Sequence, residues 1–267
     1  MTSGKEIRMS RIVDHESGKT LIVPIDDGLL DGPFGGLHNM DKLLIDIVEG
    51  KPNAILGFRY IYNYINLLKG KGIGIIENLT ASSSSGDYDD KRITSTVKDA
   101  VRRGADGVAI HVNIGSIHEP NMLENLGKIV SEADSLGIPV LALMYARGKN
   151  INETDEKEFT NSVAHAVRIG AEYGVDLIKT QFTGSIESFS FVVKGSKKVP
   201  IIIAGGPRVN DHEILNKVSL SLKAGGIGAA IGRNTFNNEN PKMFIRVAKK
   251  IIFEDSTPEK AILKSVD

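Results

Sequence analysis

Eight short apolar runs alternate with longer segments of helical periodicity along the chain, and this alternation constrains the fold more than any other feature. The runs are rich in β-branched residues and are continuous rather than alternating between polar and apolar, as is typical of strands that are buried on both faces. Repeated strand–helix units of about 30 residues predict a parallel sheet. The predicted strands are 20–25, 54–57, 73–77, 107–112, 139–144, 177–180, 200–204 and 228–231.

The segments between these runs predict amphipathic helices, of which the clearest are 40–49, 93–103, 122–136, 156–173, 211–224 and 241–253. Three of them run into a glycine shortly before the next strand, at Gly104, Gly137 and Gly174. A helix end often needs a residue in the left-handed conformation, which glycine adopts without steric cost. These glycines therefore mark the ends of helices.

Eight such units in 267 residues predict a closed (β/α)₈ barrel, the TIM barrel, as a single catalytic domain over residues 1–267. The alternative is an open, doubly wound sheet. Such a sheet usually carries a glycine-rich dinucleotide fingerprint after its first strand, and the segment VPIDDGLLDGP at 23–33 does not match it.

The composition excludes several classes of function. The chain has no cysteine, which excludes disulfides, thiolate catalysis and cysteine-bound zinc, and which fits a cytoplasmic protein. Lys+Arg and Asp+Glu both total 33, so no broad basic surface for nucleic acid or for an anionic membrane is expected. The N-terminal segment lacks the apolar run of a secretory signal, and no stretch approaches the length of a membrane helix.

Active sites of such barrels are built at the C-terminal ends of the strands, so polar residues at these positions are the candidates. They are Asp26, Asp27, His111, Asn113, Tyr145, Arg147, Lys179, Thr180, Gly205, Gly206, Gly232, Arg233 and Asn234. The segment ENLTASSSSGDYDDKR at 77–92 is interpreted as a flexible loop at the same end of the barrel, with a plain solvated linker as the alternative.

Lys179 is the most informative candidate, because it ends a buried strand and must place its amine in the barrel mouth. Burial disfavours the ammonium, so its pKa is expected to fall and a nucleophilic amine to become accessible. The alternative is a structural ion pair with a carboxylate such as Asp26.

Asp26 and Asp27 follow the first strand, and adjacent strand residues point to opposite sides, so only one of them is expected to face the mouth centrally. Asp26 is the one expected to point into the barrel mouth, and Asp27 is expected to lean toward its rim. Either could instead be an N-cap of the following turn. Tyr145 offers a phenol that can relay a proton, although a strand-end tyrosine is often a packing residue.

The glycines after the last two strands predict a phosphate site. Gly205 and Gly206 allow the backbone to approach an anion, and the helix that follows is expected to direct N–H groups toward it. Gly232 and Arg233 add a second turn and a guanidinium. Ordinary turn glycines are the alternative. His111 forms no metal-ligand spacing with nearby carboxylates, so no metal is expected.

Six motifs in order resemble the archaeal-type class I aldolase family: VPIDDG, HVNIGS, LALMYARGK, DLIKT, AGGP and GAAIGRN. The resemblance covers residues 20–253. This family includes fructose-bisphosphate aldolases and the 2-amino-3,7-dideoxy-D-threo-hept-6-ulosonate synthases, and MYARGK is closer to the latter. Two departures stand out: Asp27 occupies the place of a histidine in the synthases' MDHG, and Ala146 that of a proline.

The resemblance implies a Schiff-base lysine at Lys179, a catalytic aspartate at Asp26 and a proton-relaying tyrosine at Tyr145. It implies no metal or other cofactor, and a homo-oligomer built as a ring of five or ten chains. The residues expected to bind substrate or phosphate are Gly205, Gly206, Gly232, Arg233, Asp27, His111 and Arg147.

The expected reaction joins an enamine derived from a ketose phosphate to an aldehyde, for which L-aspartate semialdehyde is favoured. Two alternatives use the same lysine: the condensation of dihydroxyacetone phosphate with aspartate semialdehyde, and fructose-bisphosphate cleavage, in which the acceptor pocket around Met144 and Arg147 would differ. A barrel isomerase and a non-catalytic phosphosugar-binding barrel would need no imine.

Overall fold

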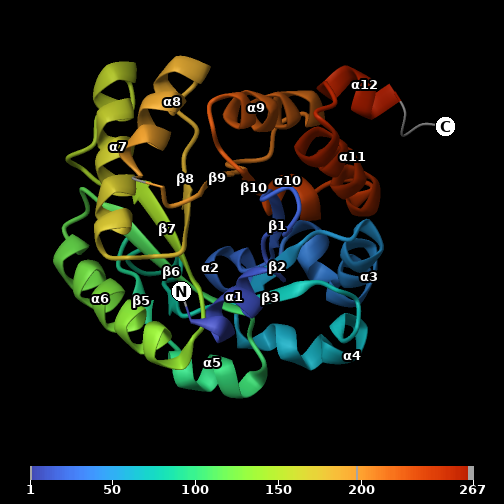
Figure 1. The fold of residues 1–267 in the computed structure, drawn as a ribbon, viewed down its shortest axis with the longest axis horizontal. Helices are drawn as coiled ribbons and strands as arrows, with labels where there is room; N and C mark the ends of the chain where they lie inside the picture. The colour runs from blue at the N-terminus through green and yellow to red at the C-terminus, as the bar shows by residue number, and fades with distance from the viewer. Residues whose placement is uncertain (1, 197, 264–267) are drawn as a thin grey trace.

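The strands close into a parallel barrel in the computed structural model, which describes residues 2–196 and 198–263 (Figure 1). Around the barrel the strands follow the order β1-β10-β9-β8-β7-β6-β3-β2, and β2 pairs with β1 to complete the circle. The barrel strands are β1 Thr20–Pro24, β2 Ala54–Gly57, β3 Gly74–Asn78, β6 Gly107–Ile114, β7 Val140–Ala146, β8 Leu177–Thr180, β9 Ile201–Ala204 and β10 Gly228–Ala230. The predicted (β/α)₈ barrel is thus confirmed. The expected domain limits, 1–267, include residues 1, 197 and 264–267, which lie outside the described residues.

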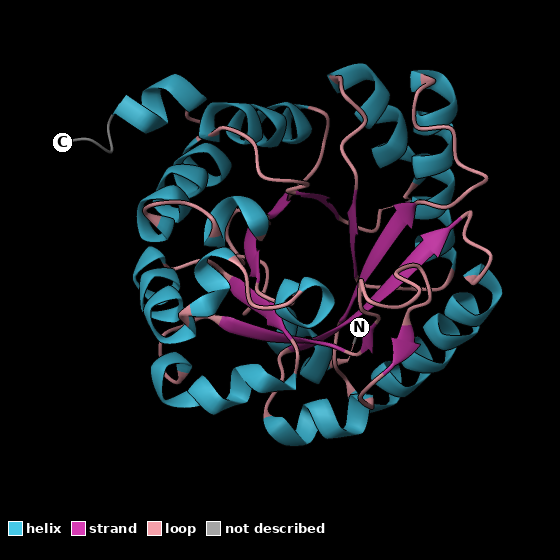
Figure 2. Ribbon diagram, turned by 180° about the vertical axis from the view of Figure 1, so that it is seen from behind, coloured by secondary structure: helices cyan, strands magenta, loops and turns pink. Residues whose placement is uncertain are grey.

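Helices form an outer ring around the strands (Figure 2). The longer ones are α3 Met40–Gly50, α5 Val97–Arg103, α6 Glu119–Leu136, α7 Glu156–Glu172, α8 Ile186–Gly195, α9 Asp211–Lys223 and α11 Pro241–Glu254. The shorter ones are α1 Ser3–Met9, α2 Asp27–Asp31, α4 Ile65–Leu68, α10 Arg233–Phe236 and α12 Pro258–Leu263, with 3₁₀ turns at Gly35–His38 and Arg59–Tyr64. In the described part of the chain, no helix is both long enough and apolar enough to cross a membrane.

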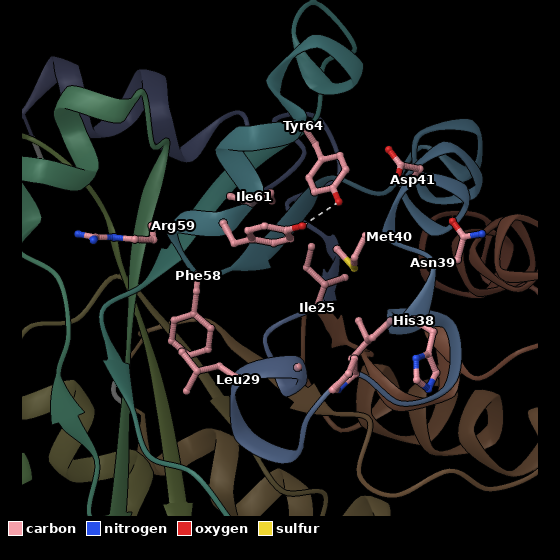
Figure 3. Close-up of a pocket in the computed structure, with 14 residues that line it drawn as sticks. Ile25, Leu29, His38, Asn39, Met40, Asp41, Phe58, Arg59, Ile61 and Tyr64 are labelled. Carbon is pink, nitrogen blue, oxygen red and sulfur yellow. Dashed lines mark hydrogen bonds between the residues drawn. The ribbon is translucent and has the colours of Figure 1, made fainter.

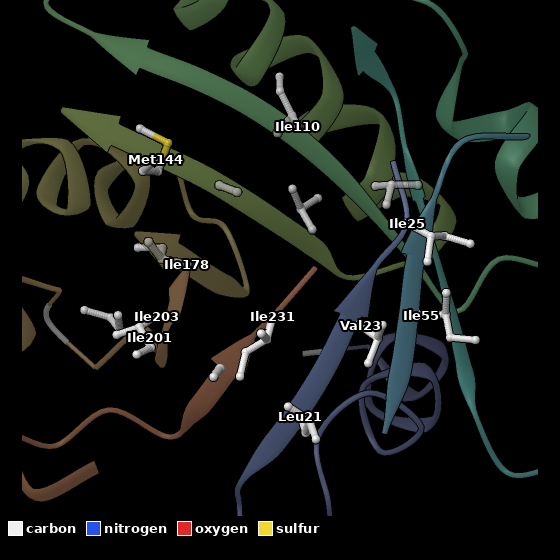
Figure 4. Close-up of a cluster of buried hydrophobic side chains, with 14 of the residues drawn as sticks. Leu21, Val23, Ile25, Ile55, Ile110, Met144, Ile178, Ile201, Ile203 and Ile231 are labelled. Carbon is white, nitrogen blue, oxygen red and sulfur yellow. The ribbon is translucent and has the colours of Figure 1, made fainter. Parts of the chain in front are cut away.

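Successive side chains of each strand face alternately into the barrel and toward the helices, which explains the continuous apolar runs. Ile22, Leu56, Ile76, Leu143 and Ile202 fill the interior. The outward-facing residues belong to a second buried cluster that includes helix residues, and Figure 4 shows several of them, among them Leu21, Val23, Ile55, Ile110, Met144, Ile178 and Ile203.

The N-terminal segment closes the end of the barrel at which the strands begin. Met9, Ile12 and Val13 pack against the interior cluster. The buried ammonium of Lys5 bonds Asp134 at 2.5 Å and Asp176 at 2.9 Å, which ties α1 to the barrel. With this end closed, the interior of the barrel opens at the C-terminal ends of the strands.

The predicted strands agree with the observed ones to within two residues at each end, and 54–57 and 177–180 coincide with them. The predicted helix 93–103 is too long, because Ile93 belongs to β5 (Arg92–Ile93), which pairs antiparallel with β4 (Thr80–Ala81). Gly104, Gly137 and Gly174 have φ values of 93°, 61° and 81°, so the predicted left-handed helix ends are confirmed.

Candidate active site

The C-terminal ends of the strands surround a cavity of about 360 Å³. Ten of the thirteen candidates from the sequence line it: Asp26, Asp27, His111, Tyr145, Arg147, Lys179, Gly205, Gly206, Gly232 and Arg233. The other three, Asn113, Thr180 and Asn234, are fully buried and do not line it. The closed barrel therefore brings together side chains that are more than 200 residues apart in the chain.

Lys179 projects into this cavity from β8. Its strand partners, Leu143 and Ile202, both face the barrel interior, and paired residues of neighbouring strands face the same side. Only 8% of Lys179 is exposed. Among the described residues, no carboxylate oxygen lies within 4.0 Å of its Nζ atom, so the alternative of a structural ion pair with Asp26 is not formed.

The pKa of Lys179 is raised above its ordinary value of 10.5, so the expectation of a lowered pKa is wrong. Burial lowers the pKa, but Tyr145, Asp26 and Asp27 together outweigh it. Because a phenol is charged only at alkaline pH, the two carboxylates supply the opposing charge near neutrality. The expectation from sequence considered desolvation and left out the carboxylates that the fold brings nearby. The ammonium must therefore give up a proton within the cavity before it can attack a carbonyl.

Asp26 is buried and held by a side chain from β3. Nδ2 of Asn78 donates to Oδ2 of Asp26 at 2.8 Å, and the backbone N–H of Thr80 donates to Oδ1 of Asn78 at 3.1 Å, which orients the amide. Asp26 occupies the N-cap position of α2, yet its side chain makes no capping hydrogen bond. Its carboxylate therefore faces the cavity and not the helix end.

Asp27 lines the same cavity as Asp26, as its predicted part in binding substrate or phosphate requires. The argument from strand alternation fails because β1 ends at Pro24, and Asp27 is already the first residue of α2. Burial and the neighbouring Asp26 raise the pKa of Asp27 to about 6, against the lowering effect of Arg233 and Lys179. A carboxyl group that is partly protonated near neutral pH thus stands beside the buried Asp26.

Tyr145 and His111 pack against each other on neighbouring strands, with ring centroids 4.9 Å apart. The phenol of Tyr145 lies close enough to Lys179 to be the largest of the influences that raise its pKa. Burial, followed by the charges of Lys91 and Arg147, holds the pKa of His111 well below its ordinary 6.5, so the imidazole is neutral. Nε2 of His111 lies 2.8 Å from Oδ1 of Asn113, which can only accept, so Nε2 carries the proton.

The turns after β9 and β10 both require glycine, which fits the predicted anion site and the alternative of ordinary turn glycines alike. Gly206 has a φ of +68°, which a residue with a side chain rarely adopts, and a Cβ on Gly232 would lie 3.0 Å from the carbonyl oxygen of Pro24. One detail of the prediction is wrong: α9 begins only at Asp211, so no helix directly follows Gly206. The helix that starts at such a turn is α10, directly after Gly232.

The segment 77–92 is not a plain linker, because β4 and β5 pair within it and its loop reaches the cavity. Tyr88 lines the cavity, and Lys91 behind it is only 1% exposed. Both were missed in the sequence, as was Gln181, which also lines the cavity and bonds the backbone of Ala146. Nothing near Lys91 in the chain signals its burial, since that burial depends on contacts made by the folded loop.

Met144 does not face the cavity, so its expected part in an acceptor pocket with Arg147 is wrong. Met144 is fully buried in the outer cluster, and its Cγ lies close to Gly170 of α7. Arg147 is three residues further along the chain. Residues an odd number of positions apart in an extended segment face opposite sides, so Arg147 lines the cavity.

A second, larger cavity of about 630 Å³ lies on the other side of α2 (Figure 3). Gly28 and Leu29 of that helix line it together with apolar and aromatic side chains such as Ile25, Phe58 and Tyr64. None of the predicted site residues reaches it, so size alone does not identify the site. Within residues 2–196 and 198–263, no group of three or more His, Asp or Glu side chains is arranged to hold a metal ion.

Residues 20–238 match the protein family described as DeoC/LacD family aldolase. The chain belongs to this family. A buried lysine in a barrel cavity, with carboxylates and a tyrosine beside it, is the arrangement expected of a class I aldolase, and the chain is such an enzyme by family.

The relatives are similar over nearly the whole length of the chain. A 2-amino-3,7-dideoxy-D-threo-hept-6-ulosonate synthase of Halobacterium salinarum is 37% identical and covers 98% of this chain and 97% of its own. A 2-amino-4,5-dihydroxy-6-oxo-7-(phosphonooxy)heptanoate synthase of Streptomyces griseus is 31% identical over 89% of this chain and 86% of its own.

Among solved structures, an archaeal fructose-1,6-bisphosphate aldolase with its catalytic lysine covalently bound to the carbinolamine intermediate of the substrate has a TM-score of 0.83. It is 27% identical in sequence and covers 94% of this chain and 99% of its own. The resemblance to class I aldolases that the sequence motifs indicated is confirmed by these comparisons.

Proposed function

We propose that this chain joins an enamine, formed on Lys179 from a ketose phosphate, to L-aspartate semialdehyde, as a 2-amino-3,7-dideoxy-D-threo-hept-6-ulosonate synthase would. The observation that carries the proposal is the burial of Lys179 in one cavity with Asp26 and Tyr145. The relatives' names supply the substrate class.

The carbon skeleton in these names defines the aldol bond. In a 2-aminoheptulosonate with its ketone at C6, an enamine forms between C6 and C5, so the new bond joins C5 to C4. Carbons 1 to 4 then come from a four-carbon amino acid aldehyde, which is aspartate semialdehyde. Both named products share this half.

In the proposed cycle, Lys179 loses a proton and its amine attacks the donor ketone to give a carbinolamine. Tyr145 donates the proton that lets water leave, and the resulting iminium is an electron sink. Asp26 removes the proton of the hydroxyl group on the carbon β to the imine, so that carbon leaves as an aldehyde, and the electrons of the broken C–C bond form the enamine. The enamine adds to the new aldehyde, Asp26 returns its proton to the alkoxide, and water releases the product.

Gly205, Gly206, Gly232 and Arg233 are proposed to bind the phosphate of the donor. Backbone N–H groups at the glycine turns and one guanidinium suit three phosphate oxygens. Contacts made far from the reacting bond can thus fix the carbonyl carbon beside the amine. Phosphorylated ketoses and aldehydes are the proposed small-molecule partners, and assembly of the chain into a ring of identical subunits stays a prediction.

A second candidate function has the same acceptor and a different donor. The product named for the Streptomyces griseus relative carries a phosphate on C7, so its three-carbon half corresponds to dihydroxyacetone phosphate. Arg233 and the two glycine turns would suit that donor equally well.

The test is to incubate the enzyme with L-aspartate semialdehyde and one donor at a time, and to identify products by mass spectrometry. The donors are dihydroxyacetone phosphate, fructose 1,6-bisphosphate and a 6-deoxyketose phosphate whose ketone adjoins the methyl carbon. A seven-carbon 2-amino keto acid supports the proposal, and its C7 phosphate distinguishes the two candidates. Cleavage of fructose 1,6-bisphosphate with no product from aspartate semialdehyde would overturn both. Lys179→Met is the control for non-enzymatic condensation.

A further inference from the structure

Lys91 is a buried cation for which the proposed reaction has no use. Only 1% of it is exposed, and among the described residues no carboxylate oxygen lies within 4.0 Å of its Nζ atom. A buried lysine without an ion pair is uncommon, because the ammonium loses its hydration. Proteins often keep a buried charged group in spite of this desolvation cost where the charge acts in a binding or catalytic site.

The contacts of Lys91 connect it to the wall of the cavity. Its Nζ atom donates to Oγ of Ser82 at 2.6 Å, and Ser82 donates to the carbonyl oxygen of Tyr88 at 2.7 Å. The same Nζ lies 4.0 Å from the centre of the Tyr88 ring. The pairing of β4 with β5 places Ser82 and Lys91 at the base of this loop. Lys91 therefore fixes both the backbone and the ring of Tyr88.

Tyr88 in turn contacts the guanidinium of Arg147. The Cζ atom of Arg147 lies 5.8 Å from the centre of the Tyr88 ring and 5.2 Å from that of Tyr145. No hydrogen bond or ion pair of the Arg147 guanidinium is found within the described residues. Arg147 is thus an unpaired cation in the cavity, held between two aromatic rings.

The barrel places this cation on a different side of the cavity from the proposed phosphate site. In the strand order, β9 and β8 lie between β10 and β7, and β1 and β2 lie between β10 and β3. Arg233 follows β10, whereas Arg147 follows β7 and Tyr88 belongs to the loop after β3. Lys179 on β8 lies between the two cationic ends. The cavity therefore suits a pair of reactants with an anionic group at each end.

We infer that Lys91 is a positioning residue that, through Tyr88, holds Arg147 in place to bind the anionic group of the acceptor aldehyde. The inference rests on the proposed aldol function and adds the place and charge of the acceptor. The anionic group is a carboxylate in aspartate semialdehyde and a phosphate in glyceraldehyde 3-phosphate. Burial and the charge of Arg147 lower the pKa of Lys91 to about 8, against the raising effect of Asp89, Asp26 and Asp31.

The test compares Lys91→Met with the wild type, because methionine keeps the length of the side chain and removes its charge. With dihydroxyacetone phosphate as donor, kcat and KM are measured for L-aspartate semialdehyde, D-glyceraldehyde 3-phosphate and the uncharged D-glyceraldehyde. The KM for both aldehydes that carry an anionic group is expected to rise by roughly 5- to 30-fold, with little change for D-glyceraldehyde. Borohydride trapping of the donor alone is expected to be unchanged. Lys71→Met, at an exposed lysine before β3, is the matched control.

An equal effect on all three aldehydes, or none on the anionic ones, would overturn the inference. A purely structural role for Lys91 predicts altered unfolding without this charge selectivity. Tyr88→Leu is a second variant, which is expected to show the same selective rise and to be non-additive with Lys91→Met.

Two further results distinguish an error in the proposed function from an error in the inference about Lys91. If only glyceraldehyde 3-phosphate reacts, the proposed acceptor is wrong, and the inference is judged on that KM. If no aldehyde is turned over, calorimetric binding of L-aspartate semialdehyde decides it. Equal Kd values for wild type and Lys91→Met would then overturn the inference.

Discussion

Oδ2 of Asp27 lies 3.7 Å from Nε of Arg233, so a carboxylate stands beside the guanidinium that we propose binds phosphate. The charge of Arg233 opposes the rise in the pKa of Asp27, and the carboxylate in turn competes with an anion for Arg233. This contact joins the two aspartates, Asp26 and Asp27, to the residues that we propose bind phosphate.

Arg233→Ala is predicted to raise the KM for the phosphorylated donor, because one charge-assisted hydrogen bond is worth roughly 1.5–3 kcal/mol, or about 10- to 150-fold. The KM for an unphosphorylated aldehyde should change much less. Steady-state kinetics with each substrate varied in turn measures both. An unchanged KM for the donor would place the phosphate elsewhere in the cavity.

Asp27→Asn is predicted to alter the dependence of stability on pH. The folded-state pKa of about 6 exceeds the ordinary 3.8, so the folded protein binds the proton more tightly than the unfolded chain. The contribution of Asp27 is therefore fully present below pH 3.8 and is lost as the pH rises through about 6. The free energy of unfolding of wild type minus variant should fall between pH 4 and pH 7, by on the order of 1–3 kcal/mol.

Urea unfolding at pH 4, 5, 6 and 7 measures this difference. Asp41→Asn, at an exposed carboxylate of α3, is the control and should follow the wild type. A difference between wild type and Asp27→Asn that does not depend on pH would show that Asp27 titrates normally.

Asp26→Asn is predicted to form the imine but to make and break the C–C bond about 10²–10⁴ times more slowly, the typical effect of losing a positioned acid–base group. The amide keeps the shape of the side chain that Asn78 holds. Single-turnover experiments that follow trapping and cleavage separately distinguish the two steps. If Asp27→Asn stops cleavage and Asp26→Asn does not, the roles of the two aspartates must be exchanged.

Arg103→Met is predicted to destabilise the barrel by about 3–5 kcal/mol, because it leaves a buried carboxylate without its partner. Glu77 on β3 is 0% exposed and accepts from Nε and Nη2 of Arg103 at 3.0 and 2.6 Å. Urea denaturation measures the loss. Arg102→Met on the same helix, where the side chain is 75% exposed, should change stability by less than about 0.5 kcal/mol. A similar small change for Arg103→Met would contradict the prediction.

The barrel could be predicted from sequence because strands buried on both faces leave continuous apolar runs, which do not depend on distant contacts. The same regularity located the C-terminal ends of the strands, and Lys179, Tyr145 and Arg147 were predicted in the cavity because they lie at or directly after such ends. Prediction failed where the chain leaves the strands. Asp27 lies in α2, where the alternation no longer applies.

The raised pKa of Lys179 and the burial of Lys91 depend on side chains brought from other strands and loops. Such contacts leave no local pattern in the sequence. The direction of a pKa shift is set by the sum of burial and neighbouring charges, and only the folded barrel shows which charges are neighbours.

The central claim is that Lys179 forms a Schiff base with the donor ketone. The most direct measurement is borohydride reduction in the presence of dihydroxyacetone phosphate, followed by intact-mass and peptide-mapping mass spectrometry of wild type, Lys179→Met and Lys179→Arg. One adduct per chain is predicted in the wild type, on the peptide that contains Lys179, and none in either variant, since methionine has no amine and arginine stays protonated. An adduct on another lysine, or one that persists at the same level in Lys179→Met, would contradict the account.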